Sequence, residues 1–435
     1  MCMINYQDAA CMTECSKIRF LILFVWANLY LSLIGFAQMY NKPFIVEELP
    51  SPGKMGAVPN LFKDHDGRVW LSWVEFLDDS TDVLKYSLLE DGKWLAGNTV
   101  AQGNNWFVNW ADFPSFTRFP GLKENYLLAH WLQKSASGTF DYDIRISINK
   151  PGLTNWSPST ILHQDGIPAE HGFVSLLPEK AGKIRAFWLD GRLTKGHEVE
   201  VKDSKDDHGG HHGTMTLHTA LIDTSGMVSD ETMLDSRICD CCQTAAAMLE
   251  NGPVVVYRDR SEREIRDISI VRFENGGWSE PTSIYNDEWM IAGCPVNGPA
   301  ISANKNKLAI AWFSGKNKKG EVKVIFSEDG GRTFGKPVVI DNNGPVGRVD
   351  IHWLNEKQTA ISWVSNQNKS AKISLQMIHS NGKKGLLQHI KDTSAERLSG
   401  FPILVPYNNG FILSTTEVNS NKSTQIKTYR LSTPK

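Results

Sequence analysis

Short apolar stretches recur along the chain about every 50–70 residues, and each begins at a Gly, Asn or Lys turn. Within each stretch, small and β-branched residues lead to an aromatic residue in six of the seven copies. The copies are 67–73, 125–131, 182–188, 252–257, 306–312, 357–363 and 410–416. Alternation and β-branched content of this kind predict β-strands.

Each copy has similar neighbours. An apolar strand precedes it, as at 244–248, and a strand that ends in a Gly turn and an aromatic residue follows it, as at 270–278. Asn-Gly and Asp-Gly tolerate positive φ and favour hairpins. Four antiparallel strands per repeat predict an all-β fold, a β-propeller of four-stranded blades. We expect seven blades, or six if the weak copy 410–416 is irregular. The lone strand 44–48 should complete the last blade and close the ring.

One turn carries a motif. Ser327-Glu-Asp-Gly-Gly-Arg-Thr-Phe334 resembles the Asp-box of the sialidase superfamily, and weaker copies occur at 91–94 and 275–278. The resemblance implies a sialidase-like propeller over most of the chain. Because the box is a structural turn in that family, it supports the fold more than an activity.

The N-terminus resembles an export signal. Lys17 and Arg19 precede an apolar run from Phe20 to Ala37, which ends in small residues suited to cleavage before Gln38. We expect a signal peptide at 1–37, one propeller domain at 38–435, and a secreted or periplasmic protein without stable membrane insertion. An uncleaved anchor is the alternative. The net charge of -2 argues against nucleic acid as a partner.

Cysteines provide the first chemical hypothesis. In a propeller, the links between blades and the links between second and third strands share one face, so several polar residues should meet at the mouth of the central channel. Thiolates and imidazoles together suit copper or zinc. The candidate ligands are Cys239, Cys241, Cys242, Cys294, His171 and His352, with His208, His211 and His212 in a long insertion on the same face. One or two disulfides are the alternative, because exported proteins often contain them.

Two further hypotheses remain open. The resemblance implies an exo-α-sialidase, in which arginines bind the substrate carboxylate and a tyrosine is the nucleophile. The candidate catalytic residues are Asp240, Arg258, Arg266, Arg348, Tyr257 and Asp112. The arginine motif that the family carries near its first blade is absent, and 57–60 reads Ala-Val-Pro-Asn instead. A non-catalytic propeller that binds a small carbohydrate or a protein is the third hypothesis. We place metal binding ahead of hydrolysis.

Overall fold

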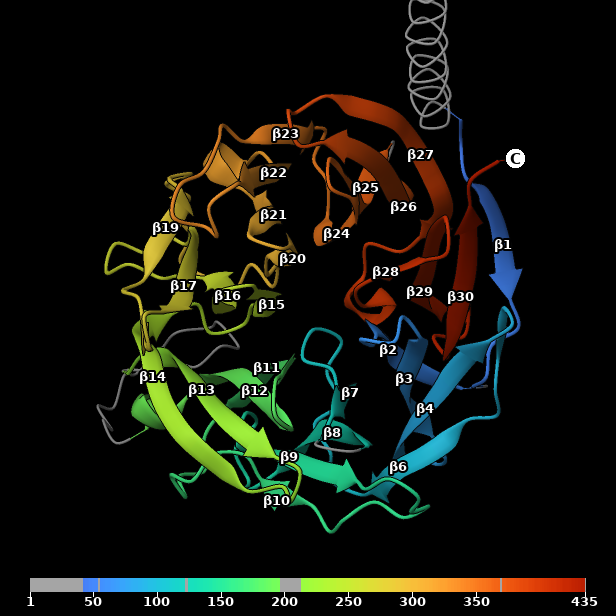
Figure 1. Ribbon diagram of the computed structural model, residues 1–435, viewed down its shortest axis with the longest axis vertical. Helices are drawn as coiled ribbons and strands as arrows, with labels where there is room; N and C mark the ends of the chain where they lie inside the picture. Colours follow the sequence, from blue (N-terminus) through green and yellow to red (C-terminus); the bar gives the residue numbers. More distant parts are fainter. Residues whose placement is uncertain (1–41, 54, 122–123, 196–212, 368–369, 435) are drawn as a thin grey trace, which may run out of the picture.

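The structure is a computed structural model that describes residues 42–53, 55–121, 124–195, 213–367 and 370–434. Seven antiparallel sheets form a ring, and the chain follows the ring in sequence order (Figure 1). Blade 1 comprises β2 (Gly56–Lys63), β3 (Val69–Phe76), β4 (Asp82–Glu90), β5 (Lys93–Trp94) and β6 (Asn98–Gly103). Blade 2 comprises β7 (Ser115–Pro120), β8 (Asn125–Lys134), β9 (Tyr142–Asn149) and β10 (Thr160–Ile161). Blade 3 comprises β11 (His171–Glu179), β12 (Lys183–Asp190), β13 (Met215–Asp223) and β14 (Val228–Ile238).

Blades 4 to 7 complete the ring in the same way. Blade 4 comprises β15 (Ala245–Leu249), β16 (Gly252–Arg258), β17 (Ile268–Glu274), β18 (Gly277–Trp278) and β19 (Thr282–Tyr285), and blade 5 comprises β20 (Ala300–Asn304), β21 (Lys307–Ser314), β22 (Glu321–Ser327) and β23 (Val338–Asp341). Blade 6 comprises β24 (Gly347–Asn355), β25 (Gln358–Gln367), β26 (Ser370–His379) and β27 (Lys384–Thr393). Blade 7 comprises β28 (Ile403–Tyr407), β29 (Gly410–Val418), β30 (Thr424–Ser432) and β1 (Ile45–Leu49). The short 3-10 helices are η1 (Arg192–Thr194), η2 (Lys316–Lys318) and η3 (Arg397–Ser399).

The ring closes between the two ends of the described chain. Strand β1 pairs antiparallel with β30 from Ile45 opposite Ser432 to Leu49 opposite Thr428, and the two strands lie side by side in Figure 1. The closure gives the last blade its fourth strand and removes an open sheet edge, which would otherwise invite pairing with other chains. The prediction of seven blades closed by the N-terminal strand is therefore confirmed, and six blades is wrong.

The aromatic residues that end the repeated stretches lie in the core. Trp73, Trp188, Trp312 and Trp363 are fully buried. Trp188 of blade 3 packs in one cluster with Leu128 and other residues of blade 2, so its ring joins two neighbouring sheets. A buried tryptophan removes on the order of 200 Å² from water, which contributes about 5 kcal/mol before the entropy of ordering is counted.

Inner strands begin with a strained bulge in several blades. Phe173 on β11 and Arg348 on β24 have φ of 54° and 55°, and the strand pairing shifts register at both places. A polar side chain from the preceding blade holds each bulge. The Phe173 N–H donates to Asp112 Oδ1 at 2.7 Å, and the Arg348 N–H donates to Asn297 Oδ1 at 2.7 Å. Gly172 is required here, because a Cβ would lie 1.9 Å from Asp112 Oδ2.

The turn between β22 and β23 is organised by one carboxylate. Asp329 Oδ1 accepts from the N–H groups of Arg332 and Thr333 at 3.0 Å and 2.9 Å, and Oδ2 accepts from the Thr333 hydroxyl at 2.6 Å. These bonds explain the Ser-x-Asp-x-Gly-x-Thr pattern of the motif as turn chemistry.

The predicted signal segment at 1–37 and the histidines 208, 211 and 212 lie outside the described residues. Within the described ranges, no helix has the length and apolarity needed to cross a membrane.

Candidate functional site

The link from β14 to β15 carries the cysteine cluster, and neighbouring blades hold this link in place. The Cys239 N–H donates to the carbonyl of Arg258 at the end of β16 at 3.0 Å. The Gln243 amide donates to the Ala111 carbonyl at 2.6 Å and accepts from the Gly298 N–H at 3.1 Å. The Gln243 side chain thus connects this link to the link that precedes β7 and to the link that precedes β20. The cluster is built on fixed backbone, which favours a preorganised site.

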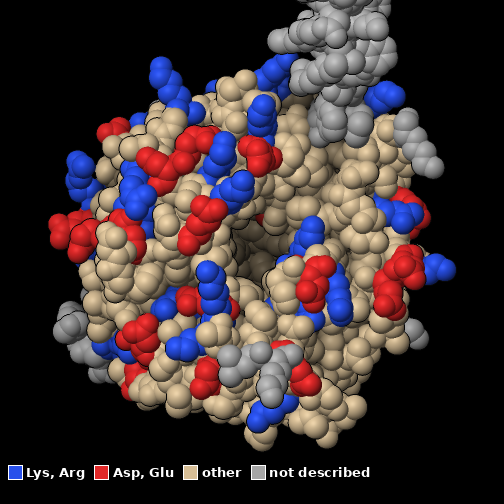
Figure 2. Space-filling model, in the orientation of Figure 1, with Lys and Arg blue, Asp and Glu red and all other residues tan. Residues whose placement is uncertain are grey.

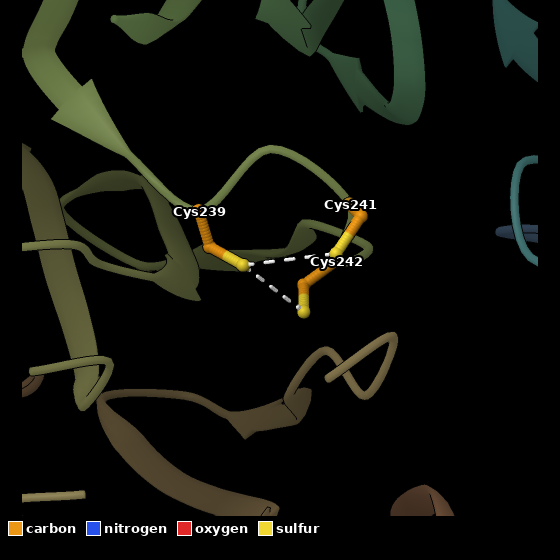
Figure 3. A group of neighbouring side chains, drawn as sticks. All are labelled: Cys239, Cys241 and Cys242. Atoms are coloured by element: carbon orange, nitrogen blue, oxygen red, sulfur yellow. Dashed lines mark hydrogen bonds between the residues drawn. The ribbon is translucent and has the colours of Figure 1, made fainter. Parts of the chain in front are cut away.

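Three sulfur atoms converge within this link. Figure 3 shows the side chains of Cys239, Cys241 and Cys242 pointing toward one another. The Sγ atom of Cys239 lies 3.5 Å from that of Cys242 and 4.0 Å from that of Cys241. All four cysteines in the described part of the chain, Cys294 included, are free thiols. The separations far exceed the length of a disulfide bond, about 2.05 Å.

One cation contacts the cluster. An Nη1 hydrogen of Arg266 donates to the Cys239 sulfur at 3.1 Å. Burial opposes ionisation of Cys239, but hydrogen bonds with the Cys241 and Cys242 thiols and the charge of Arg266 hold the pKa of Cys239 well below its usual range. The same bond to Cys239 raises the pKa of Cys241, and burial raises the pKa of Cys242. Cys239 is therefore the first thiolate of the group.

Cys294 reaches the cluster from the next blade. It lies in the link between β19 and β20 and is half-buried, as is Cys241. A hydrogen bond from the Cys241 thiol lowers the pKa of Cys294. Asp240 lies between the cysteines in the chain, and both its carboxylate oxygens accept from Nη1 of Arg260 at 3.2 Å. Its Oδ2 lies 3.8 Å from Nη1 of Arg266. Of the four cysteines that topology predicted to meet, Cys239, Cys241 and Cys242 place their sulfur atoms within 4.8 Å of one another, and Cys294 contacts this group through Cys241.

The other candidate arginines serve the backbone. Arg258 donates to the carbonyls of Asn297, Arg266 and Phe313 at 2.6–3.0 Å. Arg348 donates to the Ser399 hydroxyl and to three carbonyls in the segment 395–400 at 2.8–3.1 Å. Both guanidinium groups also lie over an aromatic ring. Neither is placed as an open clamp for a substrate carboxylate.

Asp112 belongs to a buried group that shares protons. The Tyr142 hydroxyl lies 3.3 Å from Asp112 Oδ2 and 3.0 Å from Glu170 Oε1. A phenol has one proton to donate, so one of the two carboxyls must carry a proton to complete the second bond. Burial raises the pKa of Asp112 to about 7 and that of Glu170 well above its usual range. Tyr257 is likewise buried and donates to Asp235 at 2.5 Å.

The candidate histidines lie apart from the sulfurs. His171 belongs to a group with Asp165 and Asp190, and the ligand atoms of Cys239, Cys241 and Cys242 form a separate group. His352 on β24 lies beside Asp350, with 3.4 Å between Nε2 and Oδ1. Sequence reasoning missed His163, which stacks on His171 with 3.6 Å between ring centroids. No spacing signal marks it, since a single histidine in a link resembles any polar loop residue.

The centre of the ring is hollowed on the face that Figure 2 shows, and Lys or Arg side chains alternate with Asp or Glu around the hollow. A separate pocket of about 290 Å³ lies between blades 7 and 1. Its lining is mostly apolar and includes Met55, Val58, Trp110 and Leu398.

Known proteins resemble this chain only at low sequence identity. No protein-family model matches the chain, and no curated protein matches it. Similar solved structures include a protein of unknown function from Dyadobacter fermentans, with 13% identity, a TM-score of 0.48, and coverage of 74% of this chain and 94% of that one. The Hadza microbial sialidase Hz136 has 13% identity, a TM-score of 0.44, and coverage of 81% and 73%. An α-L-arabinofuranosidase from Fusarium graminearum has 11% identity, a TM-score of 0.47, and coverage of 90% and 98%. With TM-scores below 0.5 and identities of 11–13%, these structures carry no argument about the family or the activity of this chain.

Proposed function

We propose that this protein binds a thiophilic metal ion, Cu(I) or Zn(II), through Cys239, Cys241 and Cys242, with Cys294 as a further ligand. The separation of the sulfur atoms carries the proposal. Thiolates that surround a tetrahedral ion with bonds of about 2.3 Å lie about 3.8 Å apart. The two separations from the Cys239 sulfur, 3.5 Å and 4.0 Å, bracket that value.

Charge and access support the same proposal. Metal ligation requires thiolates, and Arg266 stabilises the first of them on Cys239. Cys241 and Cys242 would release protons when the ion binds, so affinity should rise with pH. Cys239 and Cys242 are buried, whereas Cys241 and Cys294 are half-exposed and give an ion a route inward.

The ligand number separates the two metals. Three sulfurs without a nitrogen ligand suit Cu(I), which thiolates favour strongly. Zn(II) prefers four ligands, and Cys294 would supply the fourth. We also propose export, from the signal-like segment, and in an exported protein the bound ion would protect the thiols from oxidation. In an oxidising compartment, free thiols so close together form disulfides unless they are ligated.

Glycoside hydrolysis of the exo-sialidase type is the second candidate. The propeller and its Asp-box turn favour it, but the contacts of Arg258 and Arg348 do not, because backbone carbonyls already take their donors. A non-catalytic protein that binds a glycan or another protein would use the same face of the propeller and would need no catalytic residues. Of these three functions, only metal binding makes use of the cysteine cluster.

The test is reconstitution of a chain that begins at Gln38 and has been reduced and stripped of metal. We expect about one Cu(I) or one Zn(II) per chain by elemental analysis, and competition with a chelator gives the affinity of each. The Cys241→Ser/Cys242→Ser variant should lose the ion. The control is His65→Ala, which removes a half-exposed imidazole from the opposite face and should change nothing. Fully reduced protein that binds neither ion above the level of the double variant would contradict the proposal.

A further inference from the structure

A second group of metal-binding side chains lies where blades 2 and 3 meet, and the cysteine site does not use it. Asp143 comes from β9, His163 and Asp165 from the link between β10 and β11, His171 from the start of β11, and Asp190 from the end of β12. Asp143, His163 and His171 place their ligand atoms within 4.8 Å of one another, as do Asp165, His171 and Asp190.

His171 carries the positive charge of this group. Its Nε2 lies 3.1 Å from Asp165 Oδ2, and its Nδ1 lies 3.1 Å from the carbonyl of Ala169. Because both partners only accept, both ring nitrogens must donate, and the ring is an imidazolium. Burial opposes this charge, but the hydrogen bond to Asp165 and the charge of Asp190 raise the pKa of His171. His171 has no lone pair left for a metal.

His163 is the opposite case. Its Nδ1 lies 2.5 Å from Asp165 Oδ1, so Nδ1 donates and Nε2 is the ring nitrogen left to bind a metal. The side chain is only 2% exposed. Among the described residues, none gives Nε2 a hydrogen-bond partner. This nitrogen faces Asp143 Oδ1 at 3.6 Å, which is too long for a hydrogen bond. A buried ring nitrogen without a hydrogen-bond partner thus faces a carboxylate oxygen across a gap, and a cation bound between them would satisfy both.

We propose that a divalent cation of the zinc type binds between Nε2 of His163 and the carboxylate of Asp143, with Asp165 as the carboxylate that orients the histidine. An ion with bonds of about 2.1 Å at a near-tetrahedral angle spans about 3.4 Å between nitrogen and oxygen, close to the observed gap. A carboxylate on the other nitrogen of a ligating histidine fixes its tautomer and strengthens the ligand. The Asp143 side chain is 18% exposed, so the ion and its remaining water ligands reach the site from that side.

The carboxylates around the site favour such an ion. Four carboxylates line the group and its extension toward β14, namely Asp143, Asp165, Asp190 and Glu231. Arg192, which bonds Asp190 and Glu231, and the His171 imidazolium supply two positive charges. The four carboxylates favour a divalent cation at this place.

The experiment is a Zn(II) titration of the Cys241→Ser/Cys242→Ser variant, in which the first site is disabled. We expect about one weakly held ion per chain in competition with a chromophoric chelator, and a Co(II) spectrum without thiolate charge-transfer bands. Asp143→Asn and His163→Gln should each weaken binding at least about tenfold, and Asp165→Asn should do so about 10–100-fold. Asp392→Asn removes the same charge from a side chain that is 79% exposed and should leave the affinity unchanged.

Failure of the two proposals can be told apart. If the double cysteine variant does not fold, a second and weaker Zn(II) step in the wild-type titration replaces it, and Asp143→Asn should abolish that step alone. The inference is overturned if neither protein shows this weak step, or if Asp143→Asn and His163→Gln bind Zn(II) as tightly as Asp392→Asn.

Discussion

Replacement of Asp112 by Asn should make the protein more resistant to rising pH. The amide keeps an oxygen to accept from the Phe173 N–H and an N–H to donate to Tyr142, but it cannot ionise. Asn297 already plays this part at the corresponding bulge, where its Oδ1 accepts from the Arg348 N–H at 2.7 Å. The substitution therefore tests the charge of Asp112 and leaves the geometry of the bulge in place.

The magnitude follows from the pKa. Burial raises the pKa of Asp112 from 3.8 to about 7 in the folded state. The folded protein thus holds a proton that the unfolded chain releases, so folding stability falls as pH rises through this window. At about 1.4 kcal/mol per pKa unit, the wild-type protein should lose about 2–3 kcal/mol between pH 5 and pH 8 relative to Asp112→Asn.

The assay is urea unfolding of both proteins at pH 5, 6, 7 and 8, followed by tryptophan fluorescence. Other titrating groups are shared by the two proteins and largely cancel in the difference between their free energies of unfolding. Glu170 is the exception, because beyond the effect of burial the charge of Asp112 raises its pKa in the wild-type protein alone. We expect this difference to change steadily in favour of the variant as pH rises. A difference that stays constant within about 0.5 kcal/mol would refute the reasoning, because Asp112 would then titrate alike in folded and unfolded chains.

Three other changes give expected outcomes. Arg348→Ala should lower the free energy of unfolding by about 3–5 kcal/mol, measured by urea unfolding, because it leaves buried carbonyls unpaired. Asp329→Asn should destabilise the protein above pH 4 but not near pH 2, since hydrogen bonds in its turn lower the pKa of Asp329 to about 2; thermal unfolding across this range checks it. Arg266→Gln should move the metal affinity to higher pH, because the Cys239 thiolate loses its cation; chelator competition at pH 6 and 8 measures the shift.

The fold could be predicted because one strand pattern repeats. Each blade brings an aromatic residue to the same place, as Trp73 and Trp363 do, and burial between sheets requires that regularity. The strand at 44–48 had no partner of its own, so closure with the last blade followed from the need to cover an edge, and β1 does so with β30.

The site could be predicted only in part. Strands within a blade run alternately up and down, so every link between blades lies on the same face of the ring. This rule placed Cys294 near the three clustered cysteines, and Cys294 contacts Cys241. Side-chain direction could not be predicted in the same way. Arg348 has φ of 55° and points its guanidinium into carbonyls of a neighbouring link. His163 gains its chemistry from Asp165 and Asp143, and such a contact between side chains has no period in the sequence.

The central claim is that the cysteine cluster is a reduced metal site. The most direct measurement is a count of free thiols and bound metal in one sample, purified without added reductant or chelator from the compartment to which we propose that the chain is exported. The account predicts about one copper or zinc ion per chain, and four thiols that react once the protein is unfolded with a chelator. Chains without metal, in which these cysteines are paired in disulfides, would contradict it.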